Sequence, residues 1–134
     1  MGHAELRGAL EHLRAKLVKR FDGYDLTGAL DDIWEIVRWL NRHVEAAAPW
    51  QLAKDENKSD ELEQVLYDLA DGLRAVAVAL SPYLPVTAPR ILVALRQPLD
   101  LSLDQVAYGR LGETEGIEAA APLFPRVDLP TAAA

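Results

Sequence analysis

The side chains best suited to binding chemistry lie in one short stretch of the chain that ends in Pro49 and Trp50. Proline cannot continue a helix and pushes the preceding residue out of helical geometry, so Trp50 is expected at a corner just beyond a helix end. An indole at such a corner either seals it as an apolar anchor or offers a face on which an unstacked nucleobase can lie. From the residue types alone, the anchor is the commoner arrangement. Asn41 and Arg42, earlier on the same helix, are by default ordinary residues of its polar face.

The residues that usually support catalysis or hold metals are scattered along the chain. There is no cysteine, which excludes a thiolate metal site and a thiol nucleophile. The histidines lie far apart in the sequence, at His3, His12 and His43. Acidic pairs such as Asp55 and Glu56 fall in a polar loop, where nothing would hold their pKa values apart as acid–base catalysis requires. We therefore expect neither a metal site nor a catalytic site in this chain.

The composition is that of one acidic domain. A chain of 134 residues, of which 50% are hydrophobic, supports a single core. No segment approaches the ~20 apolar residues of a membrane span and the N-terminus has no apolar leader, so we expect a cytoplasmic protein without a membrane partner. The net charge of -7 argues against general attraction to nucleic acid. Basic residues gather on the first predicted helix, at Arg14, Lys16, Lys19 and Arg20, so RNA binding by the isolated chain should be weak.

Apolar spacing predicts that the element carrying these side chains is a long helix. In the stretch from Leu26 to Lys54, apolar residues recur at alternating steps of four and three, which form one stripe on a 3.6-residue helix that Pro49 stops. The predicted stripe consists of Leu26, Leu30, Ile33, Val37, Leu40 and Val44. Trp34 and Trp39 flank it and are assigned to packing, Asp32 is assigned to the polar face, and Asp25 is the predicted N-cap.

Further helices are predicted over residues 5–20, from Asp60 to Leu80, and over about residues 86–96. Asp60 and Glu63 have the spacing of a capping arrangement for the third helix. Its predicted apolar stripe is Leu62, Leu66, Leu69, Leu73, Val76 and Leu80. Small residues in its later turns, Gly72 among them, would let a neighbouring helix approach closely.

The last part of the chain is predicted to be largely non-helical. Ser102 and Gln105 have the spacing of a capping box for a short helix that Gly109 closes. Beyond it, an extended arm is expected to pack back across the bundle through Leu123 and Phe124, because large apolar groups seek burial. The predicted fold is therefore all-α, an antiparallel helical bundle of about four main helices with an extended C-terminal arm.

Motifs in three places resemble the anticodon-binding helical domain of methionyl-tRNA synthetases. The first runs from Asn41-Arg42 through Ala48-Pro49-Trp50 to Lys54. The second opens at Gly72-Leu73-Arg74 and ends at the corner Leu80-Ser81-Pro82-Tyr83-Leu84-Pro85, and the third is Leu123-Phe124-Pro125-Arg126. Because they follow the family's order over about residues 26–126, we interpret the whole chain, 1–134, as this domain.

The resemblance implies roles for the residues introduced first. In the family the tryptophan of the Ala-Pro-Trp motif stacks with the anticodon and the proline shapes the same surface, which assigns these roles to Trp50 and Pro49. Asn41 is implied as a hydrogen-bonding residue near the anticodon, and Arg42 as a contact to phosphate or to the next loop. The implied partner is methionine tRNA, recognised through its anticodon loop, and DNA has no part in this function.

The resemblance does not extend to catalysis. The family's ATP-binding signatures, His-x-Gly-His and Lys-Met-Ser-Lys-Ser, do not occur in the sequence, so we expect no aminoacylation by this chain and no cofactor in it. ATP and methionine would bind in the catalytic domain of the parent synthetase, which is the second implied partner. Nothing in the first 20 residues matches the family's first helix, which carries an Asn and an Arg that face the anticodon. The chain is therefore interpreted as a fragment that lacks this helix and the catalytic domain, either an excised piece or a natural form that starts late.

Two alternatives remain open. The chain could be the same domain of another class I aminoacyl-tRNA synthetase, although the tail Leu123-Phe124-Pro125-Arg126 favours methionine. It could also be a non-catalytic helical protein-interaction module derived from such a domain, and its acidity supports this alternative.

Overall fold

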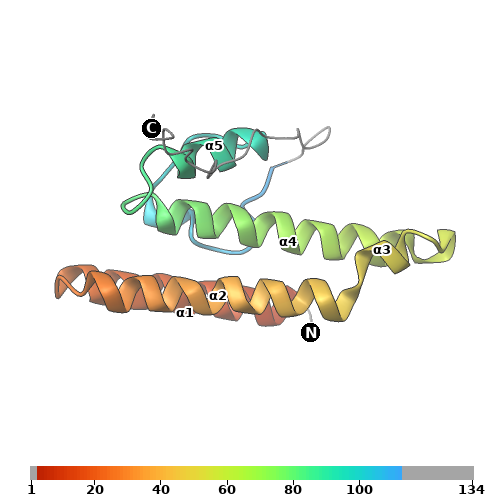
Figure 1. The fold of residues 1–134 in the computed structure, drawn as a ribbon, viewed down its shortest axis with the longest axis horizontal. Coiled ribbons are helices and arrows are strands. Elements are labelled where there is room, and N and C mark those ends of the chain that lie inside the picture. Colours follow the sequence, from red (N-terminus) through yellow and green to blue (C-terminus); the bar gives the residue numbers. More distant parts are fainter. Residues whose placement is uncertain (1–2, 113–134) are drawn as a thin grey trace, which may run out of the picture.

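The computed structural model describes residues 3–112, and this part of the chain contains helices and no strand. The elements in order are α1 (His3–Asp22), α2 (Leu26–Ala47), α3 (Pro49–Leu52), the 3-10 turn η1 (Glu56–Lys58), α4 (Ser59–Leu80), α5 (Thr87–Ala94) and the 3-10 turn η2 (Leu103–Gln105). Helices α1, α2 and α4 lie side by side and alternate in direction, and α5 lies over the C-terminal half of α4 (Figure 1). The predicted all-α bundle is thus confirmed. Leu123, Phe124 and the predicted C-terminal arm lie outside the described residues.

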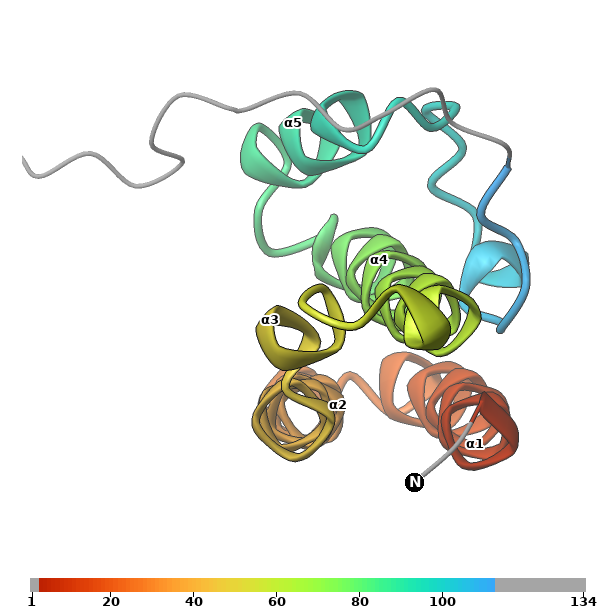
Figure 2. The same cartoon turned by 90° about the vertical axis from the view of Figure 1, so that its right-hand side faces the viewer.

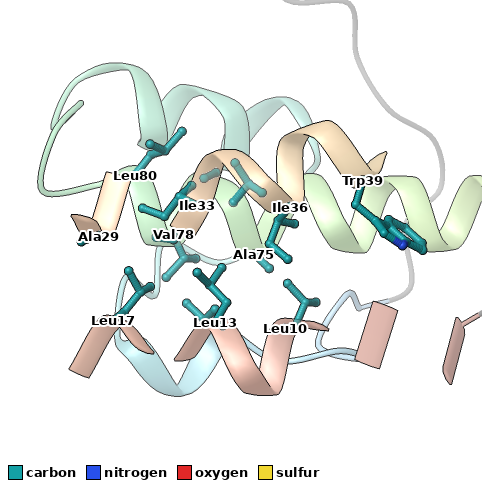
Figure 3. Close-up of a cluster of buried hydrophobic side chains, with 14 of the residues drawn as sticks. Leu10, Leu13, Leu17, Ala29, Ile33, Ile36, Trp39, Ala75, Val78 and Leu80 are labelled. Atoms are coloured by element: carbon teal, nitrogen blue, oxygen red, sulfur yellow. The ribbon is translucent and has the colours of Figure 1, made fainter. Parts of the chain in front are cut away.

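The core forms where α1, α2 and α4 meet. Helix α1 contributes one leucine per turn, and all of them are buried as the spacing predicts: Leu6, Leu10, Leu13 and Leu17. Leu10, Leu13 and Leu17 face Ile33 and Ile36 of α2 and Ala75 and Val78 of α4 (Figure 3). Each leucine removed from water contributes roughly 1.5–3 kcal/mol, so this cluster is the main source of cohesion between the three helices.

The buried face of α2 differs from the predicted stripe. Leu26 is exposed, whereas Asp32 is buried and pairs with Arg20 of α1, with 3.0 Å between Arg20 Nε and Asp32 Oδ2. Trp39 is buried as predicted, but the assignment of Trp34 to packing is wrong because its side chain is 47% exposed. The helix packs against α1 on one side and α4 on another, so its buried surface is wider than one stripe and is turned relative to the predicted one. An acidic residue can lie within it because a cation from α1 reaches its carboxylate.

Helix α4 also turns a different face inward. It begins at Ser59, directly after η1, and its N-cap Lys58 makes no side-chain capping bond, so the predicted cap at Asp60 is wrong. Leu66 is 50% exposed and Leu73 is 42% exposed, while Asp68, Asp71 and Arg74 are buried. The reason is that these charged groups find partners in the loop after α5. The predicted close approach at Gly72 is confirmed, since a Cβ there would lie 2.6 Å from Leu40 Cδ2.

The structure of the segment after α4 agrees only in part with the predictions from the sequence. Pro89 lies in the first turn of α5, where its missing N–H costs nothing. Helix α5 then ends at Ala94, and Arg96 adopts a left-handed conformation with a φ of 56°. The predicted capping box is wrong, because the Ser102 side chain makes no capping bond and Gln105 donates to the Asp100 carboxylate instead. Only a 3-10 turn forms at that place.

Between residues 3 and 112, no helix has both the length and the apolar character that crossing a bilayer requires.

Candidate nucleic-acid interface

The corner at Trp50 is built by the two residues before it. Ala48 leaves the helix with a φ of 45°, in the left-handed region, and its N–H closes the last turn of α2 on Val44 O at 3.0 Å. Pro49 then opens α3 at a position where no N–H is needed. A left-handed conformation is uncommon for a residue with a Cβ and persists only where the surroundings impose it. Proline explains why Ala48 is not right-handed helical, but by itself it favours an extended residue, so the left-handed φ comes from the turn that joins α2 to α3.

Leu52, and not Trp50, anchors this corner to the bundle. Helix α3 packs against α4, and Leu52 is 7% exposed whereas Trp50 is 53% exposed. The α3 turn is drawn at the end of α2, beside the start of α4 (Figure 1). Half of the indole surface is therefore open to solvent at a position where another residue already provides the apolar contact. An indole that is half exposed and is not the anchor of its helix has a face available for stacking.

Asn41 and Arg42 lie on the surface of α2, in the turns before the corner. Both are exposed, and neither makes a hydrogen bond or ion pair with any residue of the described range. Because consecutive residues on a helix leave it about 100° apart, the two side chains cannot point in one direction. The structure thus places Asn41, Arg42, Pro49 and Trp50 within the same end of α2 and the following turn, and leaves the polar pair available for contacts.

His43 is a feature of this region that sequence reasoning missed. Its ring is 4% exposed and stacks on Trp39, with 4.9 Å between the ring centroids and 16° between the planes. Neither ring nitrogen has a hydrogen-bond partner among the described residues. Trp39 in turn donates its Nε1–H to Glu5 Oε1 at 3.0 Å, which ties the end of α2 to the start of α1. The stack supports the last turns of α2. The four-residue spacing of Trp39 and His43 places both rings on one helix face and is the sequence signal that could have indicated the stack.

The basic residues predicted to cluster on the first helix divide into two groups. Lys16 lies 3.8 Å from Asp32 and 3.6 Å from Glu35, and Arg20 pairs with Asp25 and Asp32. These two cations therefore hold α1 against α2. Arg14 and Lys19 make no ion pair within residues 3–112. A cation that is already paired with a carboxylate attracts a polyanion less strongly. The positive charge that α1 offers to a polyanion is therefore smaller than its composition indicates.

No group of carboxylates and histidines in the part of the chain that the structure describes is arranged to hold a metal ion.

Comparisons with known proteins identify the family of the chain. No protein-family model matches the chain. Methionine–tRNA ligase of Caldanaerobacter subterraneus subsp. tengcongensis is 32% identical over 126 residues, which are 93% of this chain and 20% of the ligase. Methionine–tRNA ligase of Clostridium acetobutylicum is 38% identical over 101 residues, 75% of this chain and 16% of the ligase. Among solved structures, the apo form of Mycobacterium tuberculosis methionyl-tRNA synthetase superposes with a TM-score of 0.84 at 26% identity, covering 96% of this chain and 26% of that one.

The chain belongs to the methionyl-tRNA synthetase family. The resemblance found in the Ala48-Pro49-Trp50 motif is thereby confirmed, and so is the helical fold that it implies. The chain spans only about a fifth of the length of the methionine–tRNA ligases it matches.

Proposed function

We propose that this chain binds methionine tRNA by its anticodon loop, with Trp50 as the surface on which an anticodon base stacks. The observation that carries the proposal is that Leu52, and not Trp50, provides the buried apolar contact at the corner. Leu52 is buried and fixes α3, and Trp50 remains half-exposed beside it. An indole that contributes little to packing keeps its face for a base, and every base has a face that stacks.

The neighbouring residues complete the proposed surface. Pro49 shapes it by starting α3 at the left-handed Ala48. Asn41 offers an amide that can both donate to and accept from a base edge, and Arg42 offers a guanidinium suited to a phosphate oxygen. Both side chains are free for these roles because they have no partner among the described residues. In the parent synthetase the second partner is the catalytic domain, where ATP and methionine bind, and the enzyme acts in the cytoplasm.

The affinity of Trp50→Ala for RNA tests this proposal. Losing a stacked base costs roughly 1–3 kcal/mol, so the dissociation constant for a methionine tRNA anticodon stem-loop should rise about 5- to 150-fold. The matched control is Trp34→Ala, which also removes a half-exposed indole, but from the first half of α2 and outside the proposed surface. Titrations at one fixed salt concentration compare both variants with the unaltered chain. Equal losses in the two variants would show that Trp50 has no specific role.

A second candidate function is docking on another protein, and apolar side chains left open on α4 and α5 favour it. Leu66 and Leu73 lie seven residues apart on one face of α4, and Val93 of α5 is 57% exposed. The partner of this candidate is the catalytic domain of a methionine–tRNA ligase. Saturable binding to that separately produced domain, lost in a Leu66→Gln, Leu73→Gln variant of unchanged melting temperature, would support docking.

A further inference from the structure

A basic pocket lies on a different part of the molecule from the Trp50 corner, between α1 and the loop that follows η2. Its volume is about 580 Å³, within the range of small-molecule sites. Helix α1 contributes Arg7, Glu11 and Arg14, and the loop contributes Tyr108 and Arg110. η2 and this loop descend beside α4 on the side that faces α1 (Figure 2). Three arginines against one glutamate give the pocket a local excess of two positive charges, in a chain whose net charge is -7.

The arginines of this pocket have no ion-pair partner in the part of the chain that the structure describes. Arg7, Arg14 and Arg110 make no ion pair with any described residue, unlike Lys16 and Arg20 on the same helix. Arg7 and Arg14 are seven residues apart and thus lie on one face of α1, two turns or roughly 10 Å apart along its axis. Arg110 approaches from the opposite wall of the pocket. The three guanidinium groups can therefore act on one ligand from both sides.

Buried side chains of α4 hold the loop wall in place. Asp71 is fully buried and accepts two loop hydrogen bonds, from Gly109 N at 2.7 Å and from Leu111 N at 2.9 Å. Arg74, also buried, donates to Gln105 O at 2.6 Å and to Ala107 O at 2.7 Å. A loop tied at four backbone positions does not have to be ordered by a ligand. Ligand binding therefore requires little further loss of conformational entropy from this loop, because folding already fixes it.

Tyr108 connects this fixed loop to α4 through its hydroxyl and to α1 through its ring. Its hydroxyl donates to Asp68 Oδ1 at 2.6 Å. Burial, together with this bond, raises the pKa of Tyr108 to about 12, so the phenol stays neutral. The Arg7 guanidinium lies over the ring, 5.2 Å from its centroid. Stacking on an aromatic face fixes the plane of a guanidinium while leaving its N–H groups at the edge to donate to an anion.

We propose that this pocket binds phosphate groups through Arg7, Arg14 and Arg110. Guanidinium groups pair with phosphate oxygens by two parallel hydrogen bonds, and the charge-assisted bonds that result are the stronger kind. The pocket volume and the separation of the arginines along α1 suit a ligand with more than one phosphate group. Such a ligand is either a free polyphosphate or successive phosphodiesters of an RNA strand. The inference stands apart from the proposed function, because it requires no stacking on Trp50.

Glu11 gives the proposal a distinctive signature. Its carboxylate lines the pocket between Arg7 and Arg14 and would repel a bound phosphate. Glu11→Gln should therefore increase affinity for the anion, while Arg7→Gln and Arg14→Gln decrease it. A structural role for these arginines does not predict that gain.

Two binding experiments on the full chain at low ionic strength test the site. In the first, pyrophosphate is titrated and followed by the arginine side-chain NMR signals. Arg14→Gln and Arg110→Gln should each weaken binding by about tenfold, as expected for a lost charge-assisted contact. In the second, the salt dependence of RNA stem-loop binding is measured, and its slope should fall by about 0.7–1 for each arginine removed. Arg90→Gln is the matched control, because it changes the same charge at an exposed position of α5.

Weakened pyrophosphate binding with an unchanged RNA slope supports the site and assigns it to a free polyphosphate. A reduced RNA slope without pyrophosphate binding supports the site and assigns it to an RNA backbone. The proposal is overturned if neither quantity changes, or if Arg90→Gln has the same effect as the pocket variants. Thermal melts of each variant confirm that it is folded. These outcomes leave the Trp50 test untouched, so either proposal can fail without the other.

Discussion

Arg74 donates its Nε–H to the carboxylate of Asp71, one turn earlier on α4, at a distance of 2.9 Å. Both side chains are buried, and their remaining hydrogen-bonding atoms are directed at the backbone of the loop around Gly109. The attraction within a buried ion pair is offset by the desolvation of both charges, so the pair itself adds little to stability. Its role is to position the groups that it contacts. Here it organises the loop wall that carries Tyr108 and Arg110.

Asp71→Asn should destabilise the fold strongly. The change leaves the Arg74 charge buried without its counterion, and breaking one partner of a buried pair typically costs about 3–5 kcal/mol. Urea denaturation measures the free energy of unfolding, and Asp60→Asn, on the exposed first turn of α4, is the control. Hydrogen exchange at the amides of Gly109 and Leu111 should also accelerate. A free energy of unfolding equal to that of the control would contradict the anchoring role of the pair.

Asp25 should contribute a pH-dependent stabilisation as the N-cap of α2. Its carboxylate accepts a hydrogen bond from Gly28 N at 2.9 Å. That bond, with help from Arg20, holds the pKa of Asp25 below its usual 3.8. Because the folded-state pKa is the lower one, the stabilisation is complete above pH 3.8 and is lost as the pH falls through the folded-state value.

Two substitutions separate the cap from the charge of Asp25. Asp25→Ala should lower the melting temperature at neutral pH, and the difference from the unaltered chain should shrink in acid. Asp25→Asn keeps an oxygen that can cap the helix, so it should cost less and should lose the acid-dependent component. Melting curves over a pH series provide the measurement. A deficit of Asp25→Ala that stays constant down to the lowest pH would show that the charged form of the cap is not what stabilises α2.

His43 should be replaceable by phenylalanine without loss of stability. The ring is buried on Trp39 and its nitrogens have no partner among the described residues. Phenylalanine keeps the stack and removes the buried polar atoms, so the melting temperature should be unchanged or higher. His43→Ala, which empties the same space, should lower it. If His43→Phe is as destabilising as His43→Ala, the imidazole nitrogens make contacts that matter for stability.

Local signals in the sequence were sufficient for the main helices and the corner, but not for the start of α4 or the segment around Ser102. The leucine spacing of α1, the N-cap at Asp25 and the break at Pro49 are each decided within one or two turns of chain, and all are confirmed. The exposure of Trp50 could not be derived in this way. It depends on Leu52 packing against α4, a contact that only the folded chain provides. The resemblance to the synthetase family indicated that exposure before the geometry did.

The errors concern which face of a helix turns inward. Asp32, Asp68 and Asp71 are acidic residues that a hydrophobic pattern assigns to solvent, and all of them are buried. Each is satisfied by a partner distant in sequence: Arg20 for Asp32, Tyr108 for Asp68, and the Gly109 amide for Asp71. Helical periodicity predicts the buried face of a helix from the polarity of its residues. It therefore cannot identify a buried acidic residue whose hydrogen-bond partner is brought near only by the tertiary fold. The basic pocket escaped sequence reasoning for the same reason, because α1 and the loop after η2 meet only in the folded chain.

The indole N–H signals of the tryptophans test the central claim most directly. In a ¹H–¹⁵N correlation spectrum, adding a methionine tRNA anticodon stem-loop should shift the Trp50 Hε1 signal, because a stacked base places its ring current over the indole. Trp39, buried and bonded to Glu5, serves as the internal control and should not move. A stem-loop with a changed anticodon should produce a smaller shift at the same concentration. A stationary Trp50 signal under conditions where the RNA is bound, or equal shifts with both stem-loops, would contradict the assignment of Trp50 as the anticodon-stacking residue.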